Sequence, residues 1–228
     1  MKLYYEPSST TCRGVMLFAA EHDLALDYEH VDLFNGGHRS PEFAAINPNQ
    51  SVPVLEDDGF WMTEGSAILK YLADKMDSPT YPKPLQARAR VNAAMDWFNT
   101  GLYHDLGYGA VYPQVLPDYS RPDPAAQADT LRRGYERGAR RLRVLDGMLA
   151  EHGGPFVCGP ELTIADYLGA AYVTLAELIA FDFSPYPHVQ RWLAAMRARP
   201  AWDEVNAAFY GWRSAMLAQR KAESRFSA

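Results

Sequence analysis

Three prolines in one short stretch, Pro79, Pro82 and Pro84, divide this chain of 228 residues into two parts with different residue patterns. Before this stretch, short apolar runs alternate with helical patterns, and after it almost every pattern is helical. A proline-rich stretch without a strand or helix pattern is typical of a linker between domains. We therefore expect a first domain over residues 1–78, a linker over 79–86 and a second domain over 87–228.

The N-terminal part has the pattern of a small α/β domain. Its expected elements, in chain order, are a strand at 3–5, a helix over 12–21, strands at 28–31, 52–55 and 60–62, and a helix over 64–76. The residues Asp57-Asp58-Gly59 are a hairpin signal, because Asp-Gly pairs adopt the tight turns that join antiparallel strands. The order β-α-β followed by β-β-α predicts an α/β fold of about 80 residues.

The C-terminal part is expected to be all-helical. The predicted helices cover residues 86–108 with a continuation toward 113, residues 125–151, an apolar helix that opens at 163, and residues 187–198 and 202–210, before a frayed polar tail at 219–228. In the second of these helices, leucines recur at three- and four-residue spacing while arginines fill other positions, which predicts one buried and one solvated face. Thr163 and Asp166 are spaced as a capping box, which predicts a helix start.

Composition excludes several classes of function. The chain has 22 Lys and Arg against 28 Asp and Glu. This net charge of −6 disfavours nucleic-acid binding, because phosphate contacts need a basic surface. The two cysteines, Cys12 and Cys158, form no metal-binding or disulfide pattern, so we expect no metal and a reducing, cytoplasmic compartment. The N-terminus lacks a signal-peptide pattern, and the most apolar stretch, residues 167–183, is too short and too often interrupted to span a membrane.

Three short motifs carry the chemistry expected of this chain. Ser8–Arg13 lies between the first strand and the first helix, so its hydroxyls are either helix caps or donors to an anion above the helix N-terminus. The motif contains neither a GxSxG pattern nor a histidine that would support a serine nucleophile. Asn47–Leu55 places Pro53 at a strand start, and the sequence leaves open whether the Val52–Pro53 bond is cis. Glu64–Ile68 places a carboxylate and free amides at a helix start.

Together these motifs resemble the cytosolic glutathione S-transferase family. The resemblance rests on an SxxCR turn at Ser9–Arg13, an HxxPEFxxxNP stretch at His38–Pro48, the VPxL strand at Val52–Leu55, an ExxAIxxYL helix start at Glu64–Leu72, and an LTIAD capping box at Leu162–Asp166. These motifs span nearly the whole chain. The resemblance implies a thioredoxin-like domain followed by an all-helical domain, in agreement with the residue patterns, and the chain looks like a bacterial member.

The resemblance is strongest to the serine-type theta and delta classes, which place the catalytic serine three residues before Cys-Arg. It implies that Ser9 stabilises the thiolate of glutathione, the cosubstrate, which then attacks a small apolar electrophile. Tyrosine-type classes would instead use Tyr4 or Tyr5, and thiol-type classes would have a cysteine at the position of Thr10. We expect Cys12 to be buried in the first helix, since free cysteine often behaves as a small hydrophobe.

The resemblance also implies contacts to each part of glutathione. Val52 and Pro53 would hold its cysteinyl backbone, His38 and Gln50 its glycyl end, and Glu64 its γ-glutamyl amine. Family members commonly have serine and often arginine after this glutamate, whereas this chain has Gly65 and Ser66. The Gly65 amide and the Ser66 hydroxyl remain as expected contacts, and each lost contact to a charged group would weaken binding by about 1.5–3 kcal/mol.

We expect the electrophile pocket to lie between the domains, where ligand sites are common. Its candidate wall residues are the aromatic residues Tyr103, Tyr108, Tyr112, Phe209 and Trp212. The resemblance implies a homodimer as well. Two alternatives stay open: a glutathione-dependent lyase, isomerase or dehalogenase on the same fold, and a non-catalytic glutathione- or protein-binding relative.

Overall fold

The structure of the protein, a computed structural model, describes residues 1–226, apart from the side chains of His152 and of residues 222–226. The N-terminal domain contains β1 (Lys2–Tyr5), α1 (Thr10–Glu21), β2 (Asp27–His30), α2 (Pro41–Ile46), β3 (Val54–Asp57), β4 (Phe60–Thr63) and α3 (Gly65–Lys75). Within the described residues, the strands form a four-stranded sheet in the order β2-β1-β3-β4. The β1–β2 pair is parallel and the other pairs are antiparallel. The four strands, the hairpin and the two helices predicted for this part are confirmed, although the third strand begins two residues later than predicted, at Val54.

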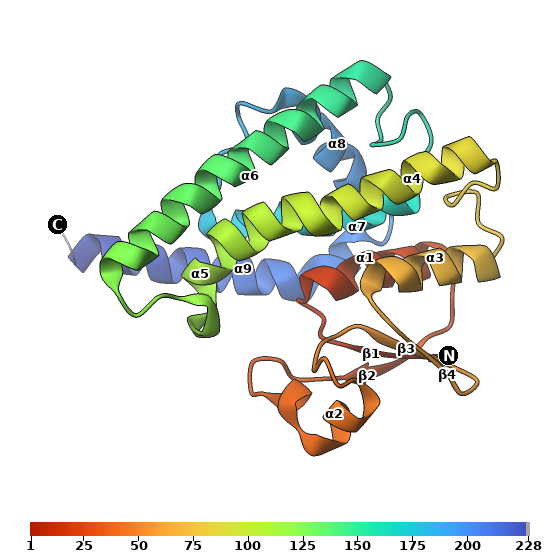
Figure 1. The fold of residues 1–228 in the computed structure, drawn as a ribbon, viewed down its shortest axis with the longest axis horizontal. Coiled ribbons are helices and arrows are strands. Elements are labelled where there is room, and N and C mark those ends of the chain that lie inside the picture. The colour runs from red at the N-terminus through yellow and green to blue at the C-terminus, as the bar shows by residue number, and fades with distance from the viewer. Residues whose placement is uncertain (227–228) are drawn as a thin grey trace.

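The two faces of the sheet are covered by different helices, with α2 on one side and α1 and α3 on the other (Figure 1). Leu3 and Leu55 are register partners and are both fully buried. The next residue, Tyr4, packs against Phe43 of α2 with 6.3 Å between ring centroids. Because successive side chains of a strand point to opposite faces, Leu3 and Leu55 face the α1 and α3 side.

The sequence analysis did not predict α2. Ser40 begins this short helix, because its hydroxyl accepts a hydrogen bond from the Phe43 amide at 3.1 Å and Pro41 occupies the first helical position. Serine at the N-cap followed by proline is a common helix start. The six-residue length of α2 left no periodic apolar pattern from which it could be predicted.

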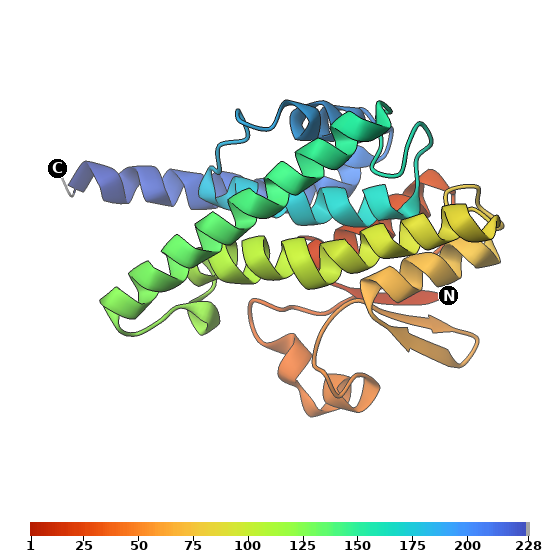
Figure 2. The same ribbon diagram turned by 45° about the horizontal axis from the view of Figure 1, so that its top comes forward.

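The described part of the C-terminal domain is helical. It contains α4 (Leu85–Trp97), a π-helical segment (Phe98–Val111), α5 (Tyr112–Val115), α6 (Pro124–His152), α7 (Ile164–Thr174), α8 (Pro187–Arg197) and α9 (Trp202–Phe226). These helices lie on the α1 and α3 side of the sheet (Figure 2). Residues 76–84, between α3 and α4, form neither helix nor strand. The exact domain bounds stay a prediction.

The last helix is longer than expected. α9 continues well beyond the predicted end at residue 210 and runs through most of the expected frayed tail to Phe226. The final two residues of that tail, 227–228, lie outside the described residues.

The first long helix of this domain also differs from its prediction, because its second half is wound as a π-helix over Phe98–Val111. Gly101, Gly107 and Gly109 lie within it, and glycine weakens the preference for α-helical winding. The hydrogen bonds of a π-helix span five residues, so Tyr103 and Tyr108, five residues apart, come to the same side.

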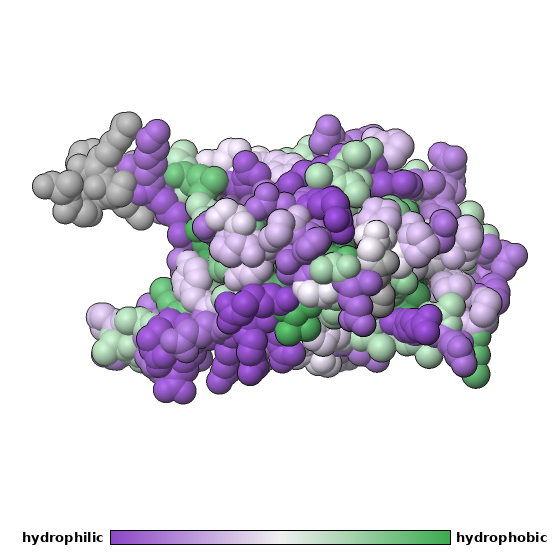
Figure 3. All heavy atoms as spheres, turned by 90° about the horizontal axis from the view of Figure 1, so that it is seen from above, coloured by the Kyte–Doolittle hydropathy of each residue, from purple (hydrophilic) through white to green (hydrophobic). Residues whose placement is uncertain are grey.

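The longest helix, α6, has the two faces predicted for it. Leu142, Leu145 and Leu149 are fully buried, whereas the arginines at 132, 133, 137, 140 and 143 are exposed. Gly134 lets the helix touch the π-helical segment directly, since a Cβ at this position would lie 1.9 Å from the carbonyl oxygen of Gly109. From above, the helical side of the molecule shows mainly hydrophilic side chains with scattered apolar ones (Figure 3).

The capping box at the start of α7 is confirmed. The Asp166 carboxylate accepts hydrogen bonds from the Thr163 amide at 2.9 Å and from the Trp192 indole at 3.0 Å. The α7 helix is buried along its whole length, as expected for the apolar stretch. Of the helices described, none is both long and apolar enough to cross a lipid bilayer.

Candidate active site

A cleft of about 770 Å³ lies between the two domains. Its N-terminal side consists of the turn before α1, the loop after β2, the segment before β3 and the start of α3. Its C-terminal side consists of aromatic and other residues from the π-helical segment, α5, the turn that follows α5, α7 and α9. Of the residues predicted for the site, the cleft brings together Ser9, His38, Gln50, Val52, Pro53, Glu64, Gly65, Tyr103, Tyr108, Tyr112 and Trp212.

Ser9 stands at the N-cap position of α1, but its hydroxyl does not cap the helix. Its amide donates to the Glu6 carbonyl at 2.9 Å, and its Oγ lies 3.1 Å from Thr11 Oγ1. The first turn of α1 contains no acidic residue that would neutralise the helix N-terminus. The Ser9 hydroxyl therefore lies in the cleft next to free helix amides, an environment that favours an anion.

The alternative thiol-activating groups named from the sequence lie elsewhere. Tyr4 packs on the α2 side of the sheet, 5.8 Å from the Trp61 ring, and Tyr5 packs against Tyr28 at 5.0 Å. Cys12 is fully buried, as predicted, and burial raises the pKa of its thiol to about 12. At neutral pH this thiol is protonated and is a poor nucleophile, since the thiolate is the reactive form.

His38 presents an unsatisfied nitrogen at one end of the cleft. Its Nδ1 is buried and has no hydrogen-bond partner among the described residues. Burial, followed by the charge of Arg39, lowers the pKa of His38, so its ring is neutral at pH 7. A buried polar atom without a partner is rare in folded proteins and is consistent with a ligand at this position.

The segment before β3 places the Val52 backbone against the start of α1. The Val52–Pro53 peptide bond is cis, which answers the question left open by the sequence. The Val52 carbonyl accepts a hydrogen bond from Thr11 Oγ1 at 2.9 Å. Within the described residues no hydrogen bond engages the Val52 amide, so it remains available to a ligand in the cleft.

The structure at the start of α3 explains why the chain has glycine at position 65, and it shows that the prediction for Ser66 is wrong. A Cβ on Gly65 would lie 2.8 Å from the Thr11 carbonyl oxygen, so a serine at this position would displace the backbone of α1. Ser66 does not line the cleft, contrary to its prediction as a glutathione contact. Its hydroxyl accepts a hydrogen bond from Asn99 at 3.0 Å, because the next position of the helix faces the C-terminal domain.

Glu64 has a backbone conformation that non-glycine residues seldom adopt. It stands at the N-cap of α3 with φ of 70° and lines the cleft. Such conformations persist where the surrounding structure enforces them, and they cluster at functional sites. Gln50, with φ of 51°, is a second strained residue of the cleft.

Tyrosines make up half of the residues that line the opposite wall of the cleft. Tyr103 stacks on Tyr172 at 4.2 Å between ring centroids, and Tyr108 lies 5.0 Å from Tyr112. The hydroxyls of Tyr103 and Tyr112 are 2.6 Å apart. Burial raises the pKa of Tyr112 to about 12, so this phenol stays protonated and can donate a hydrogen bond.

Phe209 does not belong to this wall, and its prediction as a pocket residue is wrong. It is fully buried and lies under the guanidinium of Arg13, 3.8 Å from the ring centroid. The helical spacing of aromatic residues in α9 gave no means of separating Phe209, which faces the core, from Trp212, which reaches the cleft.

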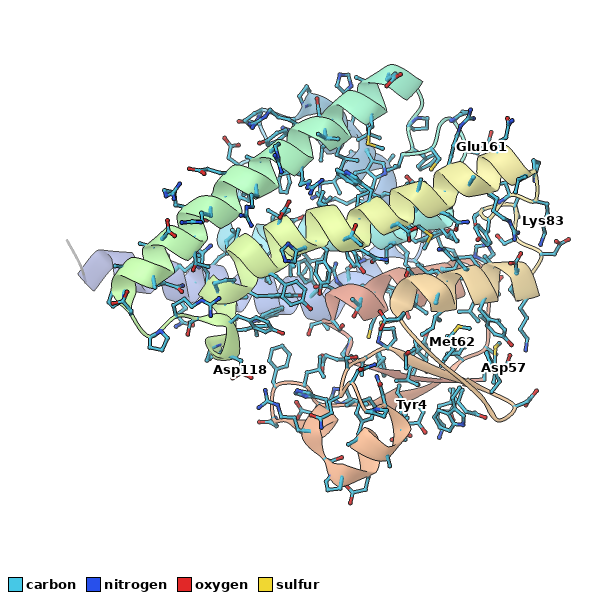
Figure 4. All side chains as sticks on the ribbon, in the orientation of Figure 1. Tyr4, Asp57, Met62, Lys83, Asp118 and Glu161 are labelled. Atoms are coloured by element: carbon cyan, nitrogen blue, oxygen red, sulfur yellow. The ribbon has the colours of Figure 1, made fainter. Side chains whose placement is uncertain are left out.

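Several cleft residues were not predicted. Phe34 packs against Trp212 at 5.4 Å between ring centroids, and Arg39 pairs with Asp118, so contacts between the two domains border the cleft. Figure 4 shows Asp118 on the turn after α5, on the side facing the N-terminal domain. Glu6 is buried in the cleft wall and accepts a hydrogen bond from His30 at 2.8 Å if that ring nitrogen carries the proton. The only sequence signal for Arg39 was its position directly after His38.

Comparisons with known proteins agree with this fold and cleft. Residues 8–75 match the family model "Glutathione S-transferase, N-terminal domain", and residues 111–200 match "Glutathione S-transferase, C-terminal domain". Glutathione S-transferase 2 of Anopheles gambiae is 32% identical over 209 residues, which cover 90% of this chain and 94% of that protein. The chain belongs to the glutathione S-transferase family.

Solved structures of this family have the same fold. A delta-class glutathione transferase of Nilaparvata lugens matches with a TM-score of 0.78 and 33% identity, covering 94% of this chain and 99% of that one. Human glutathione-S-transferase T1-1 matches with a TM-score of 0.80 and 29% identity, covering 93% of this chain and 90% of that one. Because insect and human proteins both match, a bacterial origin for this chain stays a prediction.

Proposed function

We propose that this protein is a serine-type glutathione transferase, in which Ser9 stabilises the glutathione thiolate by a hydrogen bond. The observation that carries the proposal is the Ser9 hydroxyl at the N-terminus of α1, which lies in the cleft and is not used as a helix cap. Tyr4 and Tyr5 lie outside the cleft lining, and the buried Cys12 thiol is protonated, which favours Ser9 over these three groups. Thr10, which also lines the cleft, is the alternative donor if Ser9→Ala leaves turnover unchanged.

The stabilisation that Ser9 and the N-terminus of α1 can give a thiolate is large enough to lower the pKa of the glutathione thiol. A thiol has an unperturbed pKa near 8.5, and lowering it by about two units requires about 2.7 kcal/mol. One hydrogen bond to a charged group contributes about 1.5–3 kcal/mol, and a helix N-terminus contributes about 0.3–1 kcal/mol. Ser9 and α1 together therefore suffice without a general base.

Glutathione would lie along the N-terminal side of the cleft. The free Val52 amide fits the cysteinyl backbone, and the unsatisfied His38 together with Gln50 fits the glycyl carboxylate. Glu64 and the Gly65 amide at the start of α3 fit the charged γ-glutamyl end. Since the Ser66 hydroxyl is bound to Asn99, this end has fewer side-chain donors than the family pattern provides, and we expect weaker glutathione binding.

The second substrate would be a small apolar electrophile held against the tyrosine wall. The thiolate sulfur forms a bond to the electrophilic carbon, the leaving group departs with its electron pair, and the thiol proton goes to solvent. We expect a homodimer in the cytoplasm, with no nucleic-acid or membrane partner and no metal. A glutathione-dependent lyase, isomerase or dehalogenase would use the same thiolate, so a panel of electrophiles separates these activities.

Calorimetry with glutathione and turnover with an aryl halide test the proposal. We expect binding in the millimolar range or tighter, and Ser9→Ala should lower turnover at least tenfold, which corresponds to about 1.4 kcal/mol. Ser214→Ala is a matched control, because Ser214 is exposed on α9 outside the cleft lining. Absence of binding would refute both enzyme hypotheses, and binding without turnover on any electrophile would favour the non-catalytic relative.

A further inference from the structure

We propose that Thr11 is a positioning residue for Ser9. In the resting cleft the Thr11 hydroxyl oxygen accepts a hydrogen bond from the Ser9 hydroxyl, and Thr11 thereby connects Ser9 to the Val52 segment. The proposal rests on the proposed role of Ser9 as the donor to the thiolate. Thr11 lines the same cleft and is partly buried, and the sequence motifs assigned it no role of its own.

The directions of the two hydrogen bonds at Thr11 follow from the number of protons available. Thr11 Oγ1 lies 2.9 Å from the Val52 carbonyl oxygen, which can only accept, so Thr11 donates its single proton there. Ser9 Oγ lies 3.1 Å from Thr11 Oγ1. Because the Thr11 proton is already in use, Ser9 is the donor in this second bond and Thr11 is the acceptor.

The backbone around Thr11 keeps its hydroxyl in this place. Its carbonyl oxygen touches the start of α3 so closely that a Cβ on Gly65 would lie 2.8 Å away. The neighbouring Thr10 hydroxyl accepts a hydrogen bond from Tyr112 at 3.2 Å, which ties the same turn to the C-terminal domain. Thr11 is therefore fixed between Ser9, the Val52 segment and α3, three parts of the proposed glutathione site.

A thiolate in the cleft has to compete with Thr11 for the Ser9 proton. The Thr11 acceptor holds the Ser9 side chain in position, but it also reduces the stabilisation of the thiolate by the equivalent of one neutral hydrogen bond. Removing the Thr11 hydroxyl should have two opposite effects. It should release the Ser9 proton to the thiolate, and it should deprive the Val52 carbonyl of its donor and loosen the backbone that binds glutathione.

The variant Thr11→Val tests the proposal, because valine has the shape of threonine without the hydroxyl. The pKa of bound glutathione is read from the ultraviolet absorbance of its thiolate as a function of pH, and KM is measured with a fixed electrophile. We expect the pKa of the bound thiol to fall by about half a unit to one unit and KM for glutathione to rise about threefold to tenfold. Thr11→Ser, which keeps the hydroxyl, should restore the wild-type pKa.

Other titratable groups near this site cannot by themselves produce a thiol pKa that falls in Thr11→Val and is restored in Thr11→Ser. Glu6 and Cys12 lie close to Ser9 in sequence, and the Ser9 side chain also forms a hydrogen bond with the Cys12 thiol. The other titratable or charged residues that line the cleft are His38, Arg39, Glu64, Tyr103, Tyr108, Tyr112, Asp118, Tyr119 and Tyr172. All of them are unchanged in both Thr11 variants, so a difference between Val and Ser at position 11 reports the hydroxyl.

An unchanged or raised thiol pKa in Thr11→Val would overturn the proposal. The Ser9→Ala background separates this failure from failure of the proposed function. If Ser9→Ala alone leaves the thiol pKa unchanged, Ser9 is not the donor and the proposed function is wrong. If Ser9→Ala raises the pKa, then Thr11→Val should have no further effect on it in that background. Should Thr11→Val not fold, Thr11→Ala, which leaves space for a water at the Val52 carbonyl, gives the same readout.

Discussion

Arg13 is a buried cation that joins the two domains, and its removal should destabilise the protein. Its side chain is 1% exposed and donates hydrogen bonds to the Asn206 amide oxygen and to the Ala171 carbonyl, both at 2.7 Å. Its guanidinium also stacks on Phe209 at 3.8 Å. Burial lowers the pKa of Arg13 to about 10, which leaves it protonated at neutral pH. The bonds link α1 to α7 and α9, so they contribute to domain docking.

The expected magnitude follows from these contacts. Hydrogen bonds to a charged group contribute about 1.5–3 kcal/mol each, so losing the two short ones costs about 3–6 kcal/mol. In Arg13→Met, burial of the methionine side chain returns about 1.5–3 kcal/mol. We therefore expect the free energy of unfolding to fall by about 2–3 kcal/mol. Part of this loss should come from the Asn206 oxygen, which loses its Arg13 donor in this variant.

Urea unfolding at a fixed protein concentration, followed by circular dichroism, measures the effect. Arg191→Met is a matched control, since Arg191 is exposed on α8 and its replacement should change the free energy of unfolding by less than about 0.5 kcal/mol. The double variant Arg13→Met with Asn206→Leu removes the unsatisfied oxygen. Its loss of unfolding free energy should be smaller, by at least about 1 kcal/mol, than the sum of the losses in the two single variants. A loss below about 0.5 kcal/mol in Arg13→Met, or strict additivity in the double variant, would refute this account.

Three further predictions concern other titratable groups. The pKa of His38 is lowered, so its ring gains a proton only below about pH 6.5. Glutathione affinity should therefore strengthen as pH falls through that pKa, and calorimetry on His38→Gln should show no such trend. Burial raises the pKa of Cys12 to about 12 and that of Cys158 to about 11, so a thiol reagent should react with neither at neutral pH until the protein is unfolded; rapid labelling of the native protein would contradict this. Asp166→Ala leaves buried donors without an acceptor and should lower the free energy of unfolding by about 4 kcal/mol, measured by urea unfolding against an exposed Asp182→Ala control.

Local signals predicted much of the fold. The hairpin around Gly59 followed from its turn chemistry, and the start of α7 followed from the spacing of Thr163 and Asp166. The two faces of α6 followed from the leucine and arginine pattern. Each of these features is determined by residues a few positions apart, which is the range over which turn chemistry, capping and helical periodicity act.

Features that depend on contacts distant in sequence were missed or wrong. Ser66 was assigned to the ligand, but its partner Asn99 lies 33 residues away and draws it toward the other domain. Phe209 was assigned to the pocket because nothing in α9 indicates that Arg13, far earlier in the chain, covers its ring. The π-helical winding was not predicted, and within it Gly109 closely approaches Gly134 of α6, a residue distant in sequence. Such pairings are set by tertiary packing, which overrides local preference.

The segment Ser9–Arg13 shows why the spacing of the family motif carries so much information. Successive residues at the start of a helix point about 100° apart, so each of the five faces a different part of the molecule. Ser9 faces the cleft, Thr10 meets Tyr112 of the C-terminal domain, Thr11 holds the Val52 segment, Cys12 enters the core, and Arg13 reaches α7 and α9. Inserting one residue after Ser9 would rotate the other four away from their partners at once. The spacing is therefore fixed by packing on all sides of the helix, and the position of the proposed thiolate donor depends on contacts within the N-terminal domain as well as on the docking of the two domains.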